Sequence, residues 1–222
     1  MKKITILAIS LLFSISAAFA DSTNVGFKVS SGELSASGTE TTNLGAASIV
    51  TQKERESDFQ MASFFVEREV DIKGSFSMVL GLDLVPMTAE VAKLDGGTGF
   101  DSTIEVGNMF TAYVQPTFAI NDSISLFAKA GVVEADLDIT DIKRQATTAG
   151  TASTDKAQEK SLEGSMIGFG AQMNNAFGTF DFIRLEATST DFDTISHTNS
   201  NSKKLKADAD MDVISLSIGK SF

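Results

Sequence analysis

Six charged residues stand singly among apolar residues, at positions that a regular alternation places on one face of the chain. They are Lys28, Glu67, Asp83, Lys129, Arg184 and Glu186. Three are basic and three are acidic, so a shared face would hold a balanced set of charges. Two kinds of chemistry fit such a set: a salt-bridged structural cluster, or a narrow polar path for ions or protons. A buried charge without a partner is costly, and we therefore favour the salt-bridged cluster.

The sequence offers little for metal binding or catalysis. His197 is the only histidine, and no second His, Cys or carboxylate stands at ligand spacing from it. Asp208, Asp210 and Asp212 alternate, but they lack the glycine and the later glutamate of a Ca²⁺ loop. Nucleophilic catalysis needs a nucleophile, a base and an orienting partner, and Gly-x-Ser-x-Gly is absent. We expect no enzyme, no cofactor and no metal site, and we expect the three aspartates to be solvated at an outer rim.

Alternation with a period of two residues recurs along the chain and predicts β-strands. One set of alternate residues is apolar and the other is small or polar, although Phe65 interrupts this pattern. Each alternating core is about ten residues long, the length that a tilted strand needs to cross a bilayer. The eight predicted strands contain residues 24–30, 62–70, 76–85, 109–120, 124–133, 165–173, 182–188 and 210–222.

The connections between these strands alternate between long and short. The short ones are 71–74, 121–122 and 174–178, and they are rich in Asn, Asp and Gly, as tight hairpins require. The long ones are polar, and they are 37–57, 88–105, 140–161 and 193–209. Long loops at one end and short turns at the other are typical of outer-membrane barrels, with the short turns in the periplasm.

The N-terminal residues 1–20 have the pattern of a secretory signal peptide. Two lysines precede an apolar run that ends in Ala18-Phe19-Ala20, so we expect cleavage after Ala20. Removal of 20 of the 222 residues leaves one domain of 202 residues, 21–222. It also removes two of the 18 basic residues, which leaves 16 against 29 acidic ones and a net charge of −13. This balance argues against nucleic-acid binding, and the absence of cysteine excludes a disulfide framework.

The C-terminal sequence "ISLSIGKSF" carries a resemblance to the small OmpA/OmpX-type outer-membrane barrels. Ile214, Leu216 and Ile218 alternate before a terminal Phe222. In that family such a pattern is implied to be the signal read by the barrel-assembly machinery. Lys220 departs from the resemblance, because the family usually has an aromatic or apolar residue there. The single Tyr and the absence of Trp depart from the usual aromatic girdles, a role that Phe residues would have to take.

The sequence therefore predicts an all-β, up-and-down, eight-stranded antiparallel transmembrane barrel in the outer membrane, as a monomer. Its expected role is structural, or is an interaction at the cell surface through the long loops. Two alternatives remain open at this point: a narrow pore, and a soluble periplasmic barrel that binds an apolar ligand in the manner of a lipocalin. The lipocalin-like alternative requires the apolar face of the strands to point inward, whereas the membrane barrel and the pore require it to point outward.

Overall fold

A computed structural model describes residues 22–44, 47–96, 100–143, 158–198 and 204–222. Every regular element in these ranges is a β-strand. The strands are β1 (Ser22–Leu44), β2 (Ala47–Lys73), β3 (Phe76–Val85), β4 (Ala89–Gly96), β5 (Phe100–Ala119), β6 (Ile124–Lys143), β7 (Gln158–Phe177), β8 (Phe180–Thr198) and β9 (Lys204–Ser221). The part of the chain described here contains no helix that is long and apolar enough to span a membrane. The predicted signal peptide, 1–20, lies outside the described residues.

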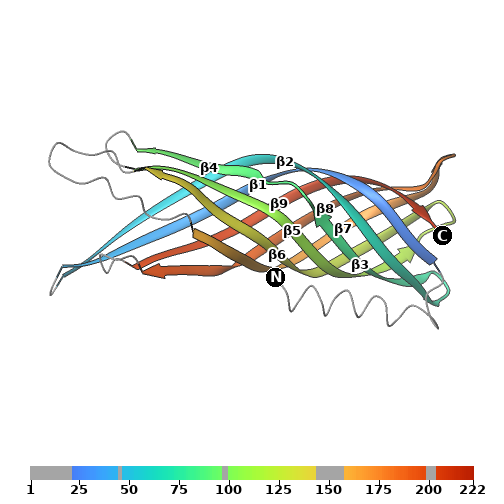
Figure 1. Ribbon diagram of the computed structural model, residues 1–222. Helices are drawn as coiled ribbons and strands as arrows, with labels where there is room; N and C mark the ends of the chain where they lie inside the picture. Colours follow the sequence, from blue (N-terminus) through green and yellow to red (C-terminus); the bar gives the residue numbers. More distant parts are fainter. Residues whose placement is uncertain (1–21, 45–46, 97–99, 144–157, 199–203) are drawn as a thin grey trace.

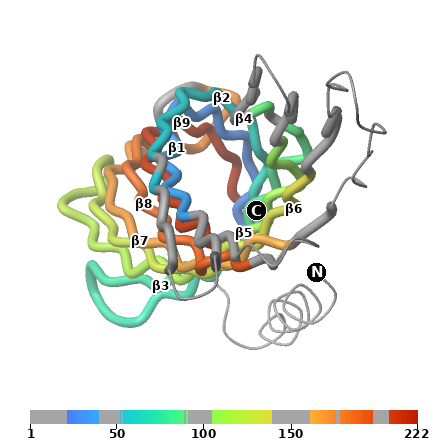
Figure 2. Tube along the Cα trace, turned by 90° about the vertical axis from the view of Figure 1, so that its left-hand side faces the viewer, coloured from blue at the N-terminus to red at the C-terminus, as the bar shows by residue number. Residues whose placement is uncertain are grey.

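The strands form a closed antiparallel ring of eight, as Figure 2 shows along the barrel axis. Strands that are neighbours in sequence pair with each other, except β3 and β4, and β1 also pairs with β9. Two hydrogen bonds of 2.9 Å between the backbones of Thr23 and Phe222 complete this closure. The third position in the ring is divided between β3 and β4, which both pair with β5. The predicted eight-stranded antiparallel barrel is confirmed, and the terminal strand closes it because an open edge would leave backbone groups without partners.

The strands are longer than the sequence predicts. Most extend far beyond the predicted cores of about ten residues, and β2 reaches 27 residues, whereas β3 keeps the predicted bounds 76–85. Much of the chain predicted as long loops is paired strand, so that β1 and β2 form one hairpin from Ser22↔Glu69 to Leu44↔Ala47. Ser- and Thr-rich sequence tolerates this, because strand pairing satisfies the backbone groups of a polar hairpin without the need for an apolar face. Figure 1 shows these extensions at the end of the barrel away from Phe222.

Three tight turns lie at the opposite end, which we call the short-turn end. Gly74 has a φ of 63° in the first turn, a conformation that glycine adopts without a steric cost. In the second turn, the Asn121 side-chain oxygen accepts hydrogen bonds of 2.9 Å from the backbone N–H groups of Ser123 and Ile124. The third joins Phe177 to Phe180. The short connections are therefore turns of the kind predicted from their Asn, Asp and Gly content.

The outward face of the barrel carries an apolar belt. Its exposed side chains include Phe27, Val29, Phe64, Val66, Phe76, Val114, Phe118, Leu126, Val132, Ile167, Phe169, Leu185, Ile214 and Leu216. The alternate residues, mostly small or polar, point into the lumen. Phe65 keeps this parity, since it is only 5 % exposed and faces inward. A soluble lipocalin-like barrel would need a polar exterior, so this arrangement contradicts that alternative and fits a bilayer.

Candidate functional site: the ion-pair network in the lumen

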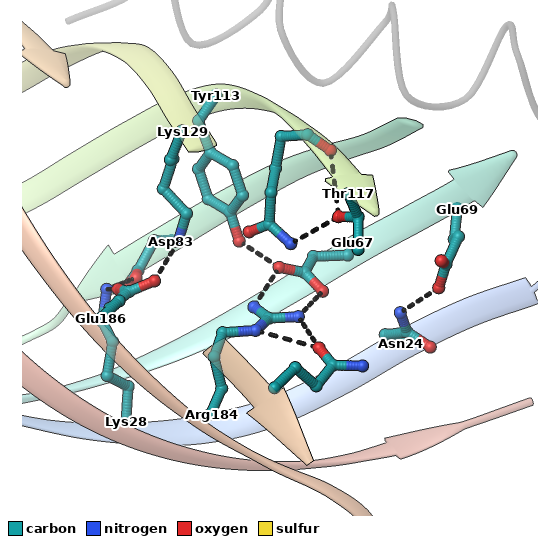
Figure 3. A network of polar contacts seen from close by, with 12 residues as sticks. Asn24, Lys28, Glu67, Glu69, Asp83, Tyr113, Thr117, Lys129, Arg184 and Glu186 are labelled. Carbon is teal, nitrogen blue, oxygen red and sulfur yellow. Dashed lines mark hydrogen bonds and ion pairs between the residues drawn. The ribbon is translucent and has the colours of Figure 1, made fainter. Parts of the chain in front are cut away.

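Arg184 and Glu67 form the centre of the lumen network (Figure 3). The Arg184 guanidinium donates to both carboxylate oxygens of Glu67, with Nη1–Oε1 at 2.7 Å and Nη2–Oε2 at 3.1 Å. It also donates to the Gln172 side-chain oxygen, from Nε at 3.1 Å and from Nη2 at 2.8 Å. The Tyr113 hydroxyl donates to Glu67 Oε1 at 2.6 Å. The bidentate geometry is the strong form of an arginine–carboxylate pair.

A second group of charges lies beside the first. Lys129 Nζ is 2.5 Å from Glu186 Oε2, and Lys28 Nζ is 3.3 Å from Glu186 Oε1. Lys28 is also paired with Asp83. The second group thus holds two lysines and two carboxylates, and Arg184 with Glu67 adds one charge of each sign. The network is electrically balanced, which is the condition for holding ionised groups away from water.

Aromatic side chains join the two groups and fill the space around them. Lys129 Nζ lies 4.3 Å from the centre of the Tyr113 ring, so Tyr113 contacts both halves of the network. The guanidinium carbon of Arg184 lies 5.0 Å from the ring centre of Phe182 and 5.3 Å from that of Phe127. These are cation–π distances, and they favour a cation in a space that water does not fill.

The network occupies the full width of the lumen at its level. Glu67 has 0 % of its surface exposed, Arg184 2 %, Glu186 2 % and Lys129 5 %. An eight-stranded barrel encloses a space that side chains alone can fill. Burial of this degree is typical of side chains that fill the space around one another.

Strand register explains how long charged side chains fit into so narrow a barrel. Glu67 pairs across the sheet with Gly81, and Lys129 pairs with Gly168. Arg184 pairs with Ser217 on β9. A small residue beside each long one leaves room for neighbouring side chains in the lumen, such as the Tyr113 ring over Gly81. The inward Gly and Ser residues of the sequence pattern thus have a packing role.

Aromatic rings also lie over inward glycines. A methyl group at Gly81 would overlap the Tyr113 ring, and one at Gly219 would overlap the Phe182 ring. Gly26 has the same relation to Phe65. These rings cover glycine backbone that has no side chain of its own. This packing holds the rings in place beside the charged groups.

All six charged residues singled out from the sequence lie in this network. Tyr113 and Gln172 were not singled out, although each completes the contacts around Glu67 and Arg184. Their place on the inward set of alternate residues was visible in the sequence. Their partners were not, because Tyr113 and Glu67 are 46 residues apart in the chain.

The other residues singled out from the sequence lie away from the lumen charges. Asp208, Asp210 and Asp212 are exposed on the outward face of β9. His197 pairs with Leu205 through the β8–β9 ladder, and its side chain lies outside the described residues. At the short-turn end, Phe222 is 72 % exposed. Ile214 and Leu216 are exposed in the apolar belt, and Ile218 on the same face is partly exposed.

The chain is similar to several solved structures at low sequence identity. The sequence matches no protein-family model, and no curated protein sequence is significantly similar to it. The structure is similar to Ail of Yersinia pestis, with 9 % identity, a TM-score of 0.38, and coverage of 88 % of this chain and 97 % of Ail. Neisserial surface protein A gives 12 % identity, a TM-score of 0.39, and coverage of 88 % and 97 %. The outer membrane protease OmpT of Escherichia coli gives 10 % identity, a TM-score of 0.38, and coverage of 92 % of this chain and 99 % of OmpT.

These neighbours are outer-membrane barrels. The strand ring and the apolar belt of this chain establish its own fold independently of them. The structural neighbours include a protease as well as proteins of other kinds, and similarity at this level assigns no activity to the chain.

Proposed function

We propose that the protein is a closed outer-membrane barrel that acts at the cell surface through the strand extensions beyond its apolar belt. In this proposal residues 1–20 direct export and are cleaved, and residues 21–222 fold as a monomer in outer-membrane lipid. The barrel-assembly machinery reads Ile214, Leu216, Ile218 and Phe222. The short turns face the periplasm, as in barrels of this type.

The observation that carries the proposal is the filled lumen. Glu67, Arg184 and Lys129 are buried and paired where a pore would need water. A function that depends on passage through the barrel would have to break these pairs, and removing one partner of a buried ion pair costs about 3–5 kcal/mol. The surface-exposed parts are therefore the better candidates for function than the lumen. The narrow pore remains the second candidate.

The exposed extensions have a distinctive charge. Outward-facing carboxylates follow the apolar belt on neighbouring strands. They are Glu33, Glu54, Glu56, Asp58, Glu163, Asp191, Asp193, Asp208, Asp210 and Asp212. Glu33 pairs with Asp58 on one side and with Asp212 on the other, so like charges stand side by side across three strands. Side-by-side like charges do not stabilise a sheet, and a surface of this kind favours positively charged partners.

Electrical recording tests the closed lumen. The purified barrel is inserted into planar bilayers, and its conductance is compared with that of a known open porin. We expect no discrete conductance steps from the wild-type protein. Steps that persist in the wild type and change size in Lys129→Ala would establish the pore instead.

Cell adhesion tests the surface role. Residues 39–52 are replaced by Asn-Gly, which joins the paired residues Gly38 and Lys53 by a two-residue hairpin turn. A second variant, Glu54→Gln/Glu56→Gln/Asp58→Asn, keeps the hairpin and removes three carboxylates from its β2 strand. We expect both variants to insert normally, and both to reduce the attachment of cells to polylysine-coated surfaces in low salt. Attachment equal to that of the wild type in both variants would contradict a role for this hairpin.

A further inference from the structure

The buried side chains of the lumen beyond the ion-pair network are mostly apolar, with Thr190 as a polar exception. Along β6 the network residue Lys129 is followed by Val133 and Ala135, and along β8 Arg184 is followed by Phe192. These residues belong to one buried cluster, which consists of Val85, Met109, Tyr113, Val133, Ala135, Leu162, Met166, Phe192, Met211 and Val213. The barrel interior thus changes from charged to apolar on the side away from the short turns.

This apolar part contains a cavity of about 50 Å³, which we call the upper chamber. It is lined by Leu34, Phe59, Met61, Val85, Met87, Val106, Gly107, Met109, Leu162, Phe192 and Met211. A buried water needs two to four polar partners, and every side chain in this lining is apolar. At roughly 10–15 Å³ for each water-sized group, the volume holds about four methylene-sized groups. The four methionines can widen it, because their unbranched side chains adapt to different shapes.

The barrel wall is interrupted beside this chamber. β3 ends at Val85 and β4 begins at Ala89. On the facing strand, Asn108 has a φ of 48° and the β5–β6 register shifts between Gly107 and Phe110. Two neighbouring strands therefore depart from regular pairing at the same level. Met87 lies in the break, lines the chamber and is still 52 % exposed.

The interruption continues as an unpaired seam. The β2–β3 ladder ends at Phe64↔Leu84, and in the described part of the chain β4 pairs with β5 alone. Figure 1 shows β4 and the β1–β2 hairpin ending in different directions beyond this point. Leu84 and Phe64 are exposed residues of the apolar belt. The seam therefore begins at the edge of the belt, where unpaired backbone groups can reach water that the bilayer centre would not supply.

We propose that the upper chamber binds the end of a single hydrocarbon chain, which enters sideways through the seam between β2 and β4. The apolar lining selects hydrocarbon over polar ligands. The network beneath it, with Tyr113 hydrogen-bonded to Glu67, makes the chamber a closed pocket and not a channel. The position of the seam at the edge of the belt puts the entrance where acyl chains of membrane lipid and free amphiphiles are both present. The inference is independent of the proposed surface role.

The chain carries its own probe for this site. Tyr113 is the only tyrosine and the protein has no tryptophan. Tyr113 packs in the same cluster as Val85 and Met109, two residues of the chamber lining. Bromine atoms quench tyrosine emission at short range, so a brominated chain in the chamber reports directly on its occupancy.

The experiment uses the full mature barrel in phosphatidylcholine vesicles, with two sources of bromine. In one arm ω-bromododecanoate is added to vesicles of unbrominated lipid, and in the other the lipid acyl chains are brominated. Two variants target the site: Met87→Glu places a charge at the entrance, and Val106→Phe enlarges a side chain of the chamber lining. Ile120→Glu is the matched control, because Ile120 is 53 % exposed but lies at the short-turn end.

We expect tyrosine quenching in the wild type and in Ile120→Glu, and loss of most of it in Met87→Glu and Val106→Phe. The arm that shows the quenching identifies the source of the chain. Heat-dependent gel mobility establishes that each variant is folded. Absent quenching in both arms would overturn the proposal. So would equal quenching in all four proteins, since bromine would then act through the barrel wall.

Discussion

The replacement of Glu67 by Gln tests whether the lumen network holds the barrel together. The change keeps the size of the side chain and removes its charge. Arg184 then loses its ionised partner at 2.7 and 3.1 Å and keeps only the Gln172 oxygen. Both residues are buried, so water cannot replace what is lost. Breaking a buried pair in this way costs about 3–5 kcal/mol. We expect the lower end of this range, because the Gln172 side-chain oxygen still accepts a hydrogen bond from Arg184.

A loss of about 3 kcal/mol is a large part of the 5–15 kcal/mol that stabilises a typical domain. The assay is reversible urea unfolding of the barrel in lipid vesicles, followed by circular dichroism and gel mobility. Glu33→Gln is the matched control, because it makes the same chemical change at an exposed residue of β1. We expect a lower midpoint for Glu67→Gln and an equal or slightly higher midpoint for the control, because Glu33 stands between Asp58 and Asp212.

A double variant separates pairing from packing. Glu67→Leu/Arg184→Met removes both charges and retains apolar volume, so it should cost less than Glu67→Leu alone. Equal midpoints for Glu67→Gln and Glu33→Gln would refute the reasoning. A double variant less stable than the single one would show that Arg184 does not depend on Glu67.

Three further outcomes follow from the same contacts. Tyr113→Phe should lower the free energy of unfolding by about 1.5 kcal/mol, because Glu67 loses one hydrogen bond to a charged group, and urea midpoints measure this. Gly81→Ala should cost about 1–3 kcal/mol by displacing the Tyr113 ring, whereas Gly178→Ala, with no atom within 4 Å of the added carbon, should leave the midpoint unchanged. Deletion of Phe222 should reduce the heat-modifiable barrel recovered in the outer membrane while leaving export intact, and wild-type recovery would count against the assembly signal.

The strand pattern could be predicted from the sequence because it depends on local information. A period of two fixes which residues share a face, so the lipid-facing positions of Phe27, Val114 and Ile214 and the inward position of Arg184 follow from parity alone. Tight turns were predictable for a similar reason, since Asn121 and Gly74 supply conformations that few other residues adopt. The total length of each strand was not, because the outer parts of the extensions are polar and depend on pairing with a neighbouring strand.

Tertiary structure decided which inward residues meet. Lys28 and Glu186 are 158 residues apart in the chain and become neighbours only when the ring closes with one particular stagger between strands. The break after Val85 and the irregularity at Asn108 come together for the same reason, and they place the upper chamber beside an unpaired seam. By itself the sequence determined the two faces of every strand, because alternation is a property of the backbone. The closure and register of the barrel determined the partners across the lumen, because those contacts depend on strands that are distant in sequence.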